Sequence, residues 1–336
     1  MHTLNTFNDW LPVIFMAVMG LSMLAYVVLD GYDLGVGILL RRASLSQKDL
    51  MIGSIGPFWD ANETWLVLGV GILLVAFPLA HGVILGALYL PVTLMLVGLI
   101  LRGVAFDFRA KAQDRHQAMW NKLFCAGSWL AALAQGYMLG AFITGFAQTW
   151  QAILFAVLVA PGVAAGYALL GATWLVMKTE GELQARAIAW ARRALWWSAG
   201  GVALVSVATP WVSTRIFEKW FSLPYLVLLA PIPLATLALF VLIDRVLRVL
   251  PLKNDKLCWL PFAATVGIFI LAFFGLAYSL FPYLVIDQIT IWQAASAPES
   301  LKIILFGAVL VLPVIVAYTI FSYRVFHGKA QPLRYD

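Results

Sequence analysis

Charged residues are scarce in this chain of 336 residues, because Asp, Glu, Lys and Arg make up only 11% while 63% of the residues are hydrophobic. A soluble domain carries about 25% charged residues, so this composition excludes an ordinary water-soluble fold. The mean hydropathy of +0.92 indicates instead a protein whose solvent is the lipid bilayer.

Cysteine and histidine are also scarce. The two cysteines, Cys125 and Cys258, share no motif, so the sequence has neither a disulfide framework nor a cysteine metal site. The histidines all fall in tails, in loops or at the ends of apolar runs: His2, His81, His116 and His327. A haem held between membrane helices needs an axial ligand within a helix. We therefore expect no haem bound by this chain's own histidines, and no metal site.

Apolar runs of about 20 residues, the length that crosses about 30 Å of hydrocarbon, recur along the chain. They predict an all-α membrane protein with nine transmembrane helices in bundles, forming one integral membrane domain over residues 1–336. No Lys or Arg occurs in residues 1–10, so we expect the first helix to stay as an anchor. The expected spans are 11–40, 57–79, 82–106, 122–146, 151–177, 194–213, 222–243, 257–285 and 302–324.

The basic residues alternate between the two sides of such a bundle. With the N-terminus outside, 19 Lys and Arg residues fall on the inner side and 3 on the outer side. This asymmetry predicts an N-terminus outside and a C-terminus in the cytoplasm. It also explains the net charge of +6 without nucleic acid, which we do not expect as a partner.

Six ionisable residues lie in or next to three consecutive spans, toward the inner side: Asp30, Asp33, Asp60, Glu63, Arg102 and Asp107. Such residues are expensive at membrane depth, so a chain that keeps several of them usually uses them. The acids of the first two spans form pairs three residues apart, which share a helix face. Two adjacent carboxylates cannot both ionise cheaply at low dielectric, so each pair is suited to holding a proton.

A simpler interpretation exists for every one of these residues, since charges near helix ends can reach headgroups or water. We prefer that interpretation for Asp107, leave Glu63 undecided, and favour a functional role for Asp60, which we expect to be buried. The flanking Trp59 and Trp65 fit an aromatic belt, although a flat aromatic ring next to a quinone would also fit.

Three stretches together resemble subunit II of the cytochrome bd-type quinol oxidases, and the match runs in order along essentially the whole chain. They are Asp30-Gly-Tyr-Asp-Leu-Gly-Val-Gly37, Gly56-Pro-Phe-Trp-Asp-Ala-Asn-Glu-Thr-Trp-Leu66 and Arg102-Gly-Val-Ala-Phe-Asp-Phe-Arg109. A later stretch, Trp292-Gln-Ala-Ala-Ser-Ala-Pro-Glu-Ser300, is similar to the short, cyanide-insensitive branch.

The resemblance implies a multi-pass subunit of the bacterial cytoplasmic membrane, in a complex that oxidises quinol and reduces oxygen to water. Subunit I would carry the b and d haems, so no catalytic residue is expected in this chain. This chain would support subunit I and contribute a cytoplasmic-side proton route, with Asp60 the strongest candidate and Asp30, Asp33 and Arg102 weaker ones. A quinone bound within the chain and a small single-span accessory subunit both stay open.

Two alternatives remain beside this interpretation. A proton-coupled secondary transporter would also keep buried carboxylates, although such proteins commonly show repeats and broken helices at mid-membrane. Here the charges lie toward one side and no repeat is visible. The other alternative is a purely structural partner subunit, whose carboxylates only pair with Arg102 or with subunit I.

Overall fold

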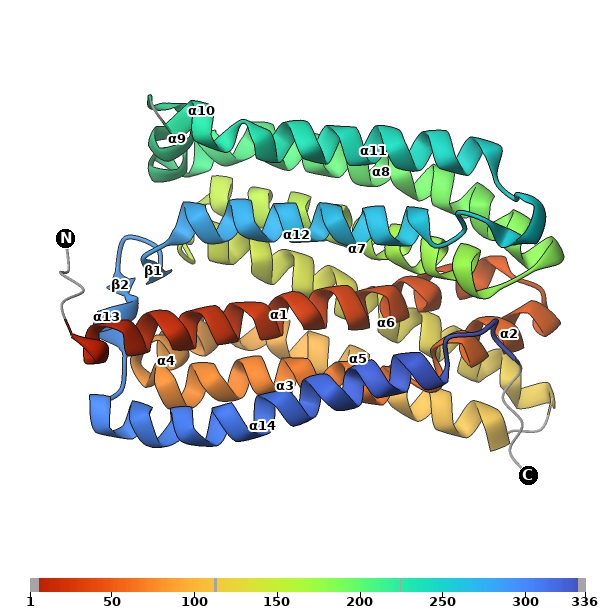
Figure 1. Cartoon of the computed structure of the whole chain (residues 1–336), viewed down its shortest axis with the longest axis horizontal. Coiled ribbons are helices and arrows are strands. Elements are labelled where there is room, and N and C mark those ends of the chain that lie inside the picture. Colours follow the sequence, from red (N-terminus) through yellow and green to blue (C-terminus); the bar gives the residue numbers. More distant parts are fainter. Residues whose placement is uncertain (1–5, 112–113, 224, 332–336) are drawn as a thin grey trace.

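The computed structural model describes residues 6–111, 114–223 and 225–331. Its helices run side by side along the longest axis of the molecule (Figure 1). Within the described residues, nine helical segments are long and apolar enough to cross a membrane, which confirms the predicted fold class. They are α1 (Phe7–Leu39), α3 (Trp59–Ala76), α5 (Tyr89–Lys111), α6 (Asp114–Ile143), α7 (Trp150–Lys178), α8 (Gly181–Val212), α10 and α11 (Tyr225–Leu229 and Pro231–Val249), η2 and α12 (Lys253–Asp255 and Leu260–Leu280), and α14 (Pro298–Val325).

The predicted boundary between the second and third spans, 57–79 and 82–106, is wrong. Helix α3 already ends at Ala76, and a separate helix, α4 (Pro78–Ala87), lies between α3 and α5. Phe77 has φ −134° and ψ 56°, outside the helical region, and Pro78 begins α4 at a position where its missing N–H costs nothing. The hydrophobic run is continuous across this corner, so it hides the break.

Other predicted ends also differ from the structure. Span 122–146 is α6, which ends at Ile143 because Gly145 and Phe146 both adopt φ of 62°. Span 194–213 begins 13 residues earlier, at Gly181, since the polar stretch before it forms the first turns of α8. Span 222–243 continues to Val249, and span 257–285 ends at Leu280, after which the chain forms a strand.

Short elements close the two ends of the bundle. At one end, α2 (Leu45–Ile55) follows a single 3-10 turn, η1 (Leu40–Arg42), and packs on α1 and α7. At the other end lie α9 (Thr214–Phe221), α13 (Ile291–Ala294) and a two-stranded antiparallel hairpin. The strands of that hairpin are β1 (Tyr283–Val285) and β2 (Ile289–Thr290).

Helix α1 is the central helix, in contact with α3, α6, α7, α12 and α14. Its closest neighbour is α7, where a Cβ built on Gly35 would lie 1.8 Å from the carbonyl oxygen of Tyr167. A Cβ on Gly171 would in turn lie 2.3 Å from the carbonyl carbon of Gly35. Gly31 and Gly35, four residues apart, therefore form the face on which α1 packs closely against α7.

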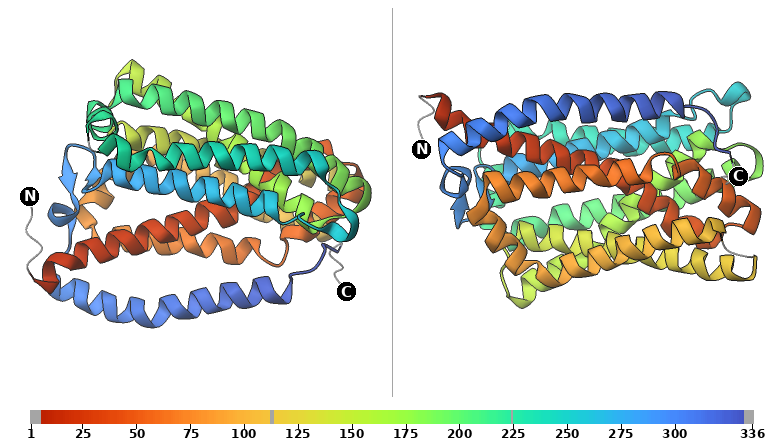
Figure 2. Two further views of the ribbon diagram at one scale, coloured as in Figure 1. Left: turned by 45° about the horizontal axis from the view of Figure 1, so that its top comes forward. Right: turned by 90° about the horizontal axis from the view of Figure 1, so that it is seen from below.

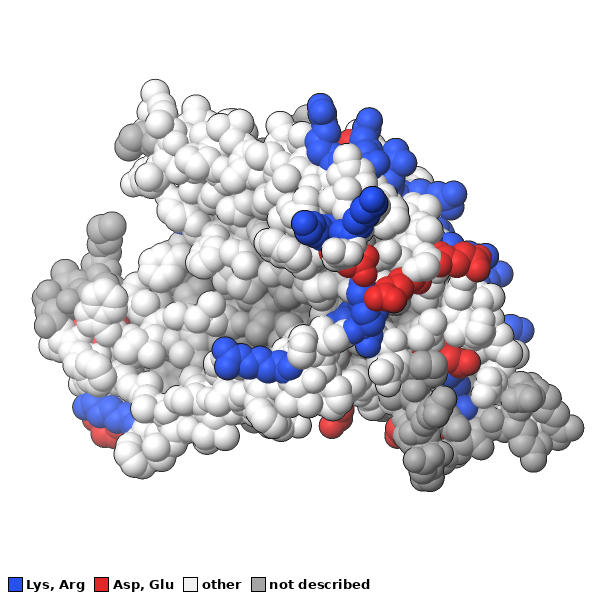
Figure 3. Space-filling model, turned by 45° about the vertical axis from the view of Figure 1, so that its right-hand side comes forward, with Lys and Arg blue, Asp and Glu red and all other residues white. Residues whose placement is uncertain are grey.

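Helix α14 lies at the edge of the bundle, beside α1 and α3 (Figure 2). Only two of its residues, Leu301 and Ser322, are buried. Helices α1, α11 and α14 end on the same side of the bundle, where Lys and Arg side chains gather (Figure 3). We call this side the basic end. Arg245, Arg248 and Arg324 belong to this group.

Candidate functional site

Arg102 of α5 is the centre of a buried ionic cluster near the basic end. Its Nη1 donates a 2.5 Å hydrogen bond to Oδ1 of Asp30 on α1. Its Nη2 lies 3.6 Å from Oε1 of Glu63 on α3 and 4.0 Å from Oδ2 of Asp33. The structure therefore brings together four of the five predicted site residues from three consecutive spans.

The cluster has more negative than positive groups and is enclosed by protein. The side chains of Arg102, Asp30 and Asp33 are 0% exposed, and that of Glu63 is 27% exposed, so Glu63 alone opens toward the surface. Five polar atoms of the cluster have no hydrogen-bond partner in the protein: Asp30 Oδ2, Asp33 Oδ1, Glu63 Oε1, Arg102 Nε and Arg102 Nη2. Buried polar groups are nearly always paired, so these five atoms need partners other than the side chains of this chain, such as water molecules.

Asn62 joins the cluster to a closed ring of hydrogen bonds. Its Nδ2 donates to Asp33 Oδ2 at 2.8 Å and to the Tyr32 hydroxyl at 3.0 Å. The Tyr323 hydroxyl on α14 donates to Asn62 Oδ1 at 3.2 Å and lies 2.6 Å from the Tyr32 hydroxyl. Tyr32 therefore donates to Tyr323, and the ring Asn62–Tyr32–Tyr323 uses each of its hydroxyl protons within itself.

A second polar group lies one helical turn from Asp30, toward the middle of the bundle. Gln135 of α6 donates to the Tyr26 hydroxyl at 2.8 Å and accepts from the Tyr167 hydroxyl at 2.6 Å. All three side chains are buried. Residues four apart share a helix face, so Tyr26 and Asp30 lie on the same side of α1.

Asp60 is the predicted site residue that the structure leaves outside the cluster. It is exposed in the first turn of α3, where we expected a buried carboxylate. The reason is that residues 59–63 span little more than one turn, so Asp60 and Glu63 share a face but differ in depth. Asp107 is exposed too, as expected.

The two tryptophans of α3 have different surroundings. The Trp59 ring centroid is 6.0 Å from the guanidinium carbon of Arg102, close enough for a cation–π contact, and 5.0 Å from the ring of Phe106. Trp65 is buried, and its Nε1 has no hydrogen-bond partner in the protein. Trp59 is thus part of the wall of the ionic cluster.

Several residues of this site did not stand out in the sequence. Asn62 lies between Asp60 and Glu63, but an amide beside two acids carries little signal on its own. Gln135 could have been found as a single polar residue within an apolar run. Arg109, which is buried and pairs with Asp49 of α2 and Asn121 of α6, has no sequence signal beyond its position at a helix end.

The histidines of the described residues are spread over separate elements. His81 lies in α4, His116 near the start of α6 and His327 just after α14, while His2 lies outside the described residues. In the same part of the chain, no group of three or more His, Cys, Asp or Glu residues could hold a metal ion.

Comparison with known proteins agrees with this geometry. Residues 11–326 match the family model described as cytochrome bd terminal oxidase subunit II. The chain belongs to this family. It is 28% identical to cytochrome bd-I ubiquinol oxidase subunit 2 of Escherichia coli K12, over 95% of both chains. It is also 28% identical to cytochrome bd ubiquinol oxidase subunit 2 of Bacillus subtilis, over 92% of this chain and 95% of the relative.

The fold of this subunit II also resembles a solved structure, that of the bd oxidase from Geobacillus thermodenitrificans. The TM-score is 0.74 at 18% identity, with 95% of this chain and 99% of the solved chain covered. The chain is therefore a multi-pass protein of the bacterial inner membrane and a component of a quinol oxidase complex.

Proposed function

We propose that this subunit II supports a haem-bearing subunit I and conducts protons from the cytoplasmic side toward the site of oxygen reduction. The observation that carries the proposal is the cluster of Asp30, Asp33 and Glu63 around a single guanidinium, that of Arg102. One cation balances one carboxylate, so the remaining carboxylates are neutral only while they hold protons. A group that takes up and releases protons inside the membrane suits a relay.

The route that we infer begins at Asp60 and passes through Glu63 to the buried acids. Asp60 is exposed and precedes Glu63 by three residues on α3, and Glu63 is the only member of the cluster with an exposed fraction. Asp30 Oδ2, Asp33 Oδ1 and Glu63 Oε1 have no hydrogen-bond partner in the protein, so water molecules would connect these carboxylates and complete the path.

The exposed face of α3 and α5 would suit a contact with subunit I. Asp60 and Asp107 are exposed on this face, together with the apolar Val104 and Phe108. Carboxylates that face lipid are costly, whereas carboxylates at a subunit contact can find partners or water. We assign this face to subunit I, and the b and d haems to that subunit, as the resemblance to the bd-type oxidases implies.

We infer the orientation from the charges at the basic end, where Lys and Arg gather (Figure 3). The positive-inside rule assigns this end to the cytoplasm, which gives an N-terminus outside and a C-terminus inside. The ionic cluster then lies on the side from which protons are taken. A quinone near Trp59 and Trp65 and a small accessory subunit stay predictions.

The test is to replace Glu63 by Gln and Asp60 by Asn in the intact complex. Each variant removes one protonation site and keeps the shape of the side chain. We expect oxygen consumption at saturating quinol to fall by about a hundredfold or more, the lower end of the range for loss of a proton-transfer group, with the haem spectrum unchanged. Glu182→Gln at the exposed start of α8 is the matched control and should keep normal turnover.

The outcome separates the alternatives. Normal oxygen consumption in both variants, with intact haem, would favour the purely structural partner. If the isolated chain is colourless, stable and moves a solute into liposomes, the secondary transporter would be the better interpretation.

A further inference from the structure

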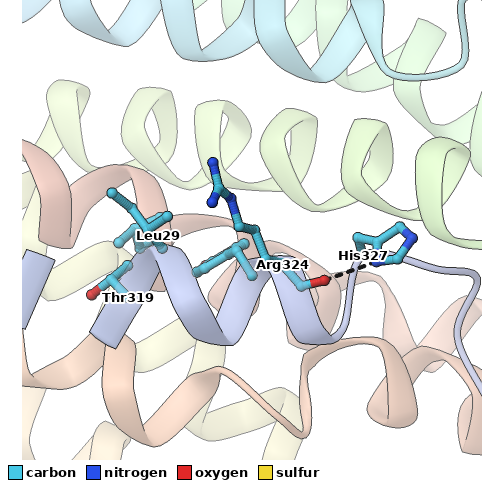
Figure 4. Close-up of a pocket in the computed structure, with 6 residues that line it drawn as sticks. Leu29, Thr319, Arg324 and His327 are labelled. Atoms are coloured by element: carbon cyan, nitrogen blue, oxygen red, sulfur yellow. Dashed lines mark hydrogen bonds between the residues drawn. The ribbon is translucent and has the colours of Figure 1, made fainter. Parts of the chain in front are cut away.

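A pocket of about 480 Å³ opens between α1 and the inner half of α14, outside the ionic cluster. Its wall is formed by Leu29 of α1 and by residues of α14 and the segment after it: Thr319, Ile320, Tyr323, Arg324 and His327. In the close-up, Arg324 extends away from the α14 ribbon, between Leu29 and His327 (Figure 4). The pocket thus has an apolar body and a basic end.

The basic end lies at the depth of lipid headgroups. Helix α14 has 28 residues, so at 1.5 Å per residue it is about 42 Å long, against about 30 Å of hydrocarbon. Arg324 is the second-last residue of this helix, and Ile320 lies one turn deeper. A molecule in the pocket would therefore place its polar part beside Arg324 and its apolar part beside Ile320 and Leu29.

The cations near this pocket differ in their partners. Of the neighbouring cations, Lys178 donates to the carbonyl oxygens of Phe326 and Gly328, and Lys329 pairs with Asp255 at 2.7 Å. Among the described residues, no carboxylate forms an ion pair with Arg324. The Nδ1 atom of His327 lies 2.8 Å from the Arg324 carbonyl oxygen. An unpaired guanidinium above an apolar pocket attracts an anion that has an apolar body.

We propose that this pocket binds one anionic phospholipid, with the phosphate on Arg324 and His327 and an acyl chain along Leu29 and Ile320. The charge selects an anionic headgroup over a zwitterionic one, and the depth selects a lipid over a free phosphate. The lipid fills the seam between α14 and α1. This matters because α14 has only two buried residues, and near the pocket it is joined to α1 and α3 by the Tyr323 hydroxyl and by stacking of the Tyr323 ring on Phe58.

The test uses the whole oxidase complex, purified in mild detergent and depleted of lipid. Dioleoyl phosphatidylglycerol or dioleoyl phosphatidylcholine is added in mixed micelles, and bound lipid is counted by native mass spectrometry. We expect one tightly retained phosphatidylglycerol, and at least about tenfold weaker retention of it in Arg324→Gln, which is a loss of about 1.4 kcal/mol. Arg245→Gln, which removes an exposed arginine at the basic end of α11, is the matched control and should bind like the wild type.

A second variant keeps the proposal open to refutation if Arg324→Gln fails to assemble. Ile320→Trp fills the apolar body of the pocket and keeps the charge, so it should also lose the retained phosphatidylglycerol. Equal retention of phosphatidylcholine and phosphatidylglycerol would overturn the proposal. So would a co-purified quinone that occupies the pocket and is kept in Arg324→Gln, or retention of phosphatidylglycerol in both pocket variants.

Discussion

The guanidinium of Arg102 donates to the carboxylate of Asp30 across 2.5 Å, with both side chains fully buried, and so links α5 to α1. Desolvation of the two charges offsets much of their attraction. The pair is therefore weak as a source of stability but costly to break. The contribution of this pair to stability can therefore be measured separately from proton transfer.

Arg102→Gln should lower the stability of the complex by about 3–5 kcal/mol, because it leaves buried carboxylates without their cation. The double variant Asp30→Asn/Arg102→Gln removes both charges and should recover part of that loss. The measurement is the thermal unfolding midpoint of the purified complex, together with the yield of haem-loaded complex.

The control for this pair is Arg248→Gln, which breaks the exposed ion pair of Arg248 with Asp244 on α11. Exposed pairs contribute about 0–1 kcal/mol, so the midpoint should hardly change. A double variant that is no more stable than Arg102→Gln alone would contradict the role of Asp30 as the main partner.

Tyr323→Phe should loosen α14 without slowing the enzyme. It removes two hydrogen bonds from the Asn62–Tyr32–Tyr323 ring, at a cost of about 1–3 kcal/mol. The ring uses its hydroxyl protons internally and is therefore a latch between α14, α1 and α3, separate from the proposed route. We expect faster hydrogen exchange in the inner half of α14 and oxygen consumption close to that of the wild type.

Tyr318→Phe provides the comparison for that experiment, since Tyr318 is on the same helix and its ring is exposed. It should leave hydrogen exchange of α14 unchanged. If Tyr323→Phe instead slows turnover as strongly as Glu63→Gln, then protons do pass through the ring, and the latch interpretation is wrong.

The nine spans could be predicted because bilayer thickness sets a length that apolar runs must reach. The ends of the spans are harder to predict from the sequence. The corner at Phe77 lies within one hydrophobic run, so no change of composition marks it. The start of α8 at Gly181 is hidden for a different reason. Charged residues interrupt the apolar run there, although buried residues such as Leu183 and Ala187 lie between them.

The ionic cluster could be predicted in part, since consecutive antiparallel spans place residues at matching depths. Asp30, Asp33 and Arg102 meet as this argument requires, and Glu63 joins them. Asp60 stays outside the cluster because it lies in the first turn of α3, nearer the helix end than Glu63, and the sequence does not specify where this helix begins. Tyr323 could not be placed at all, because nothing in the pattern of α14 identifies α1 and α3 as its neighbours.

Gly35→Ala should prevent the normal close packing of α1 on α7. The new Cβ would lie 1.8 Å from the carbonyl oxygen of Tyr167, and a backbone atom cannot rotate away as a side chain can. The helices must then separate, at a cost of about 3 kcal/mol, the upper part of the range for an overpacked core. We expect a several-fold lower yield of haem-loaded complex and a lower unfolding midpoint.

Gly71→Ala on α3, where no atom lies within 4 Å of the added Cβ, is the matched control and should equal or exceed wild-type stability. Wild-type yield and midpoint in Gly35→Ala would mean that α1 and α7 are farther apart in the assembled oxidase than they are in this chain.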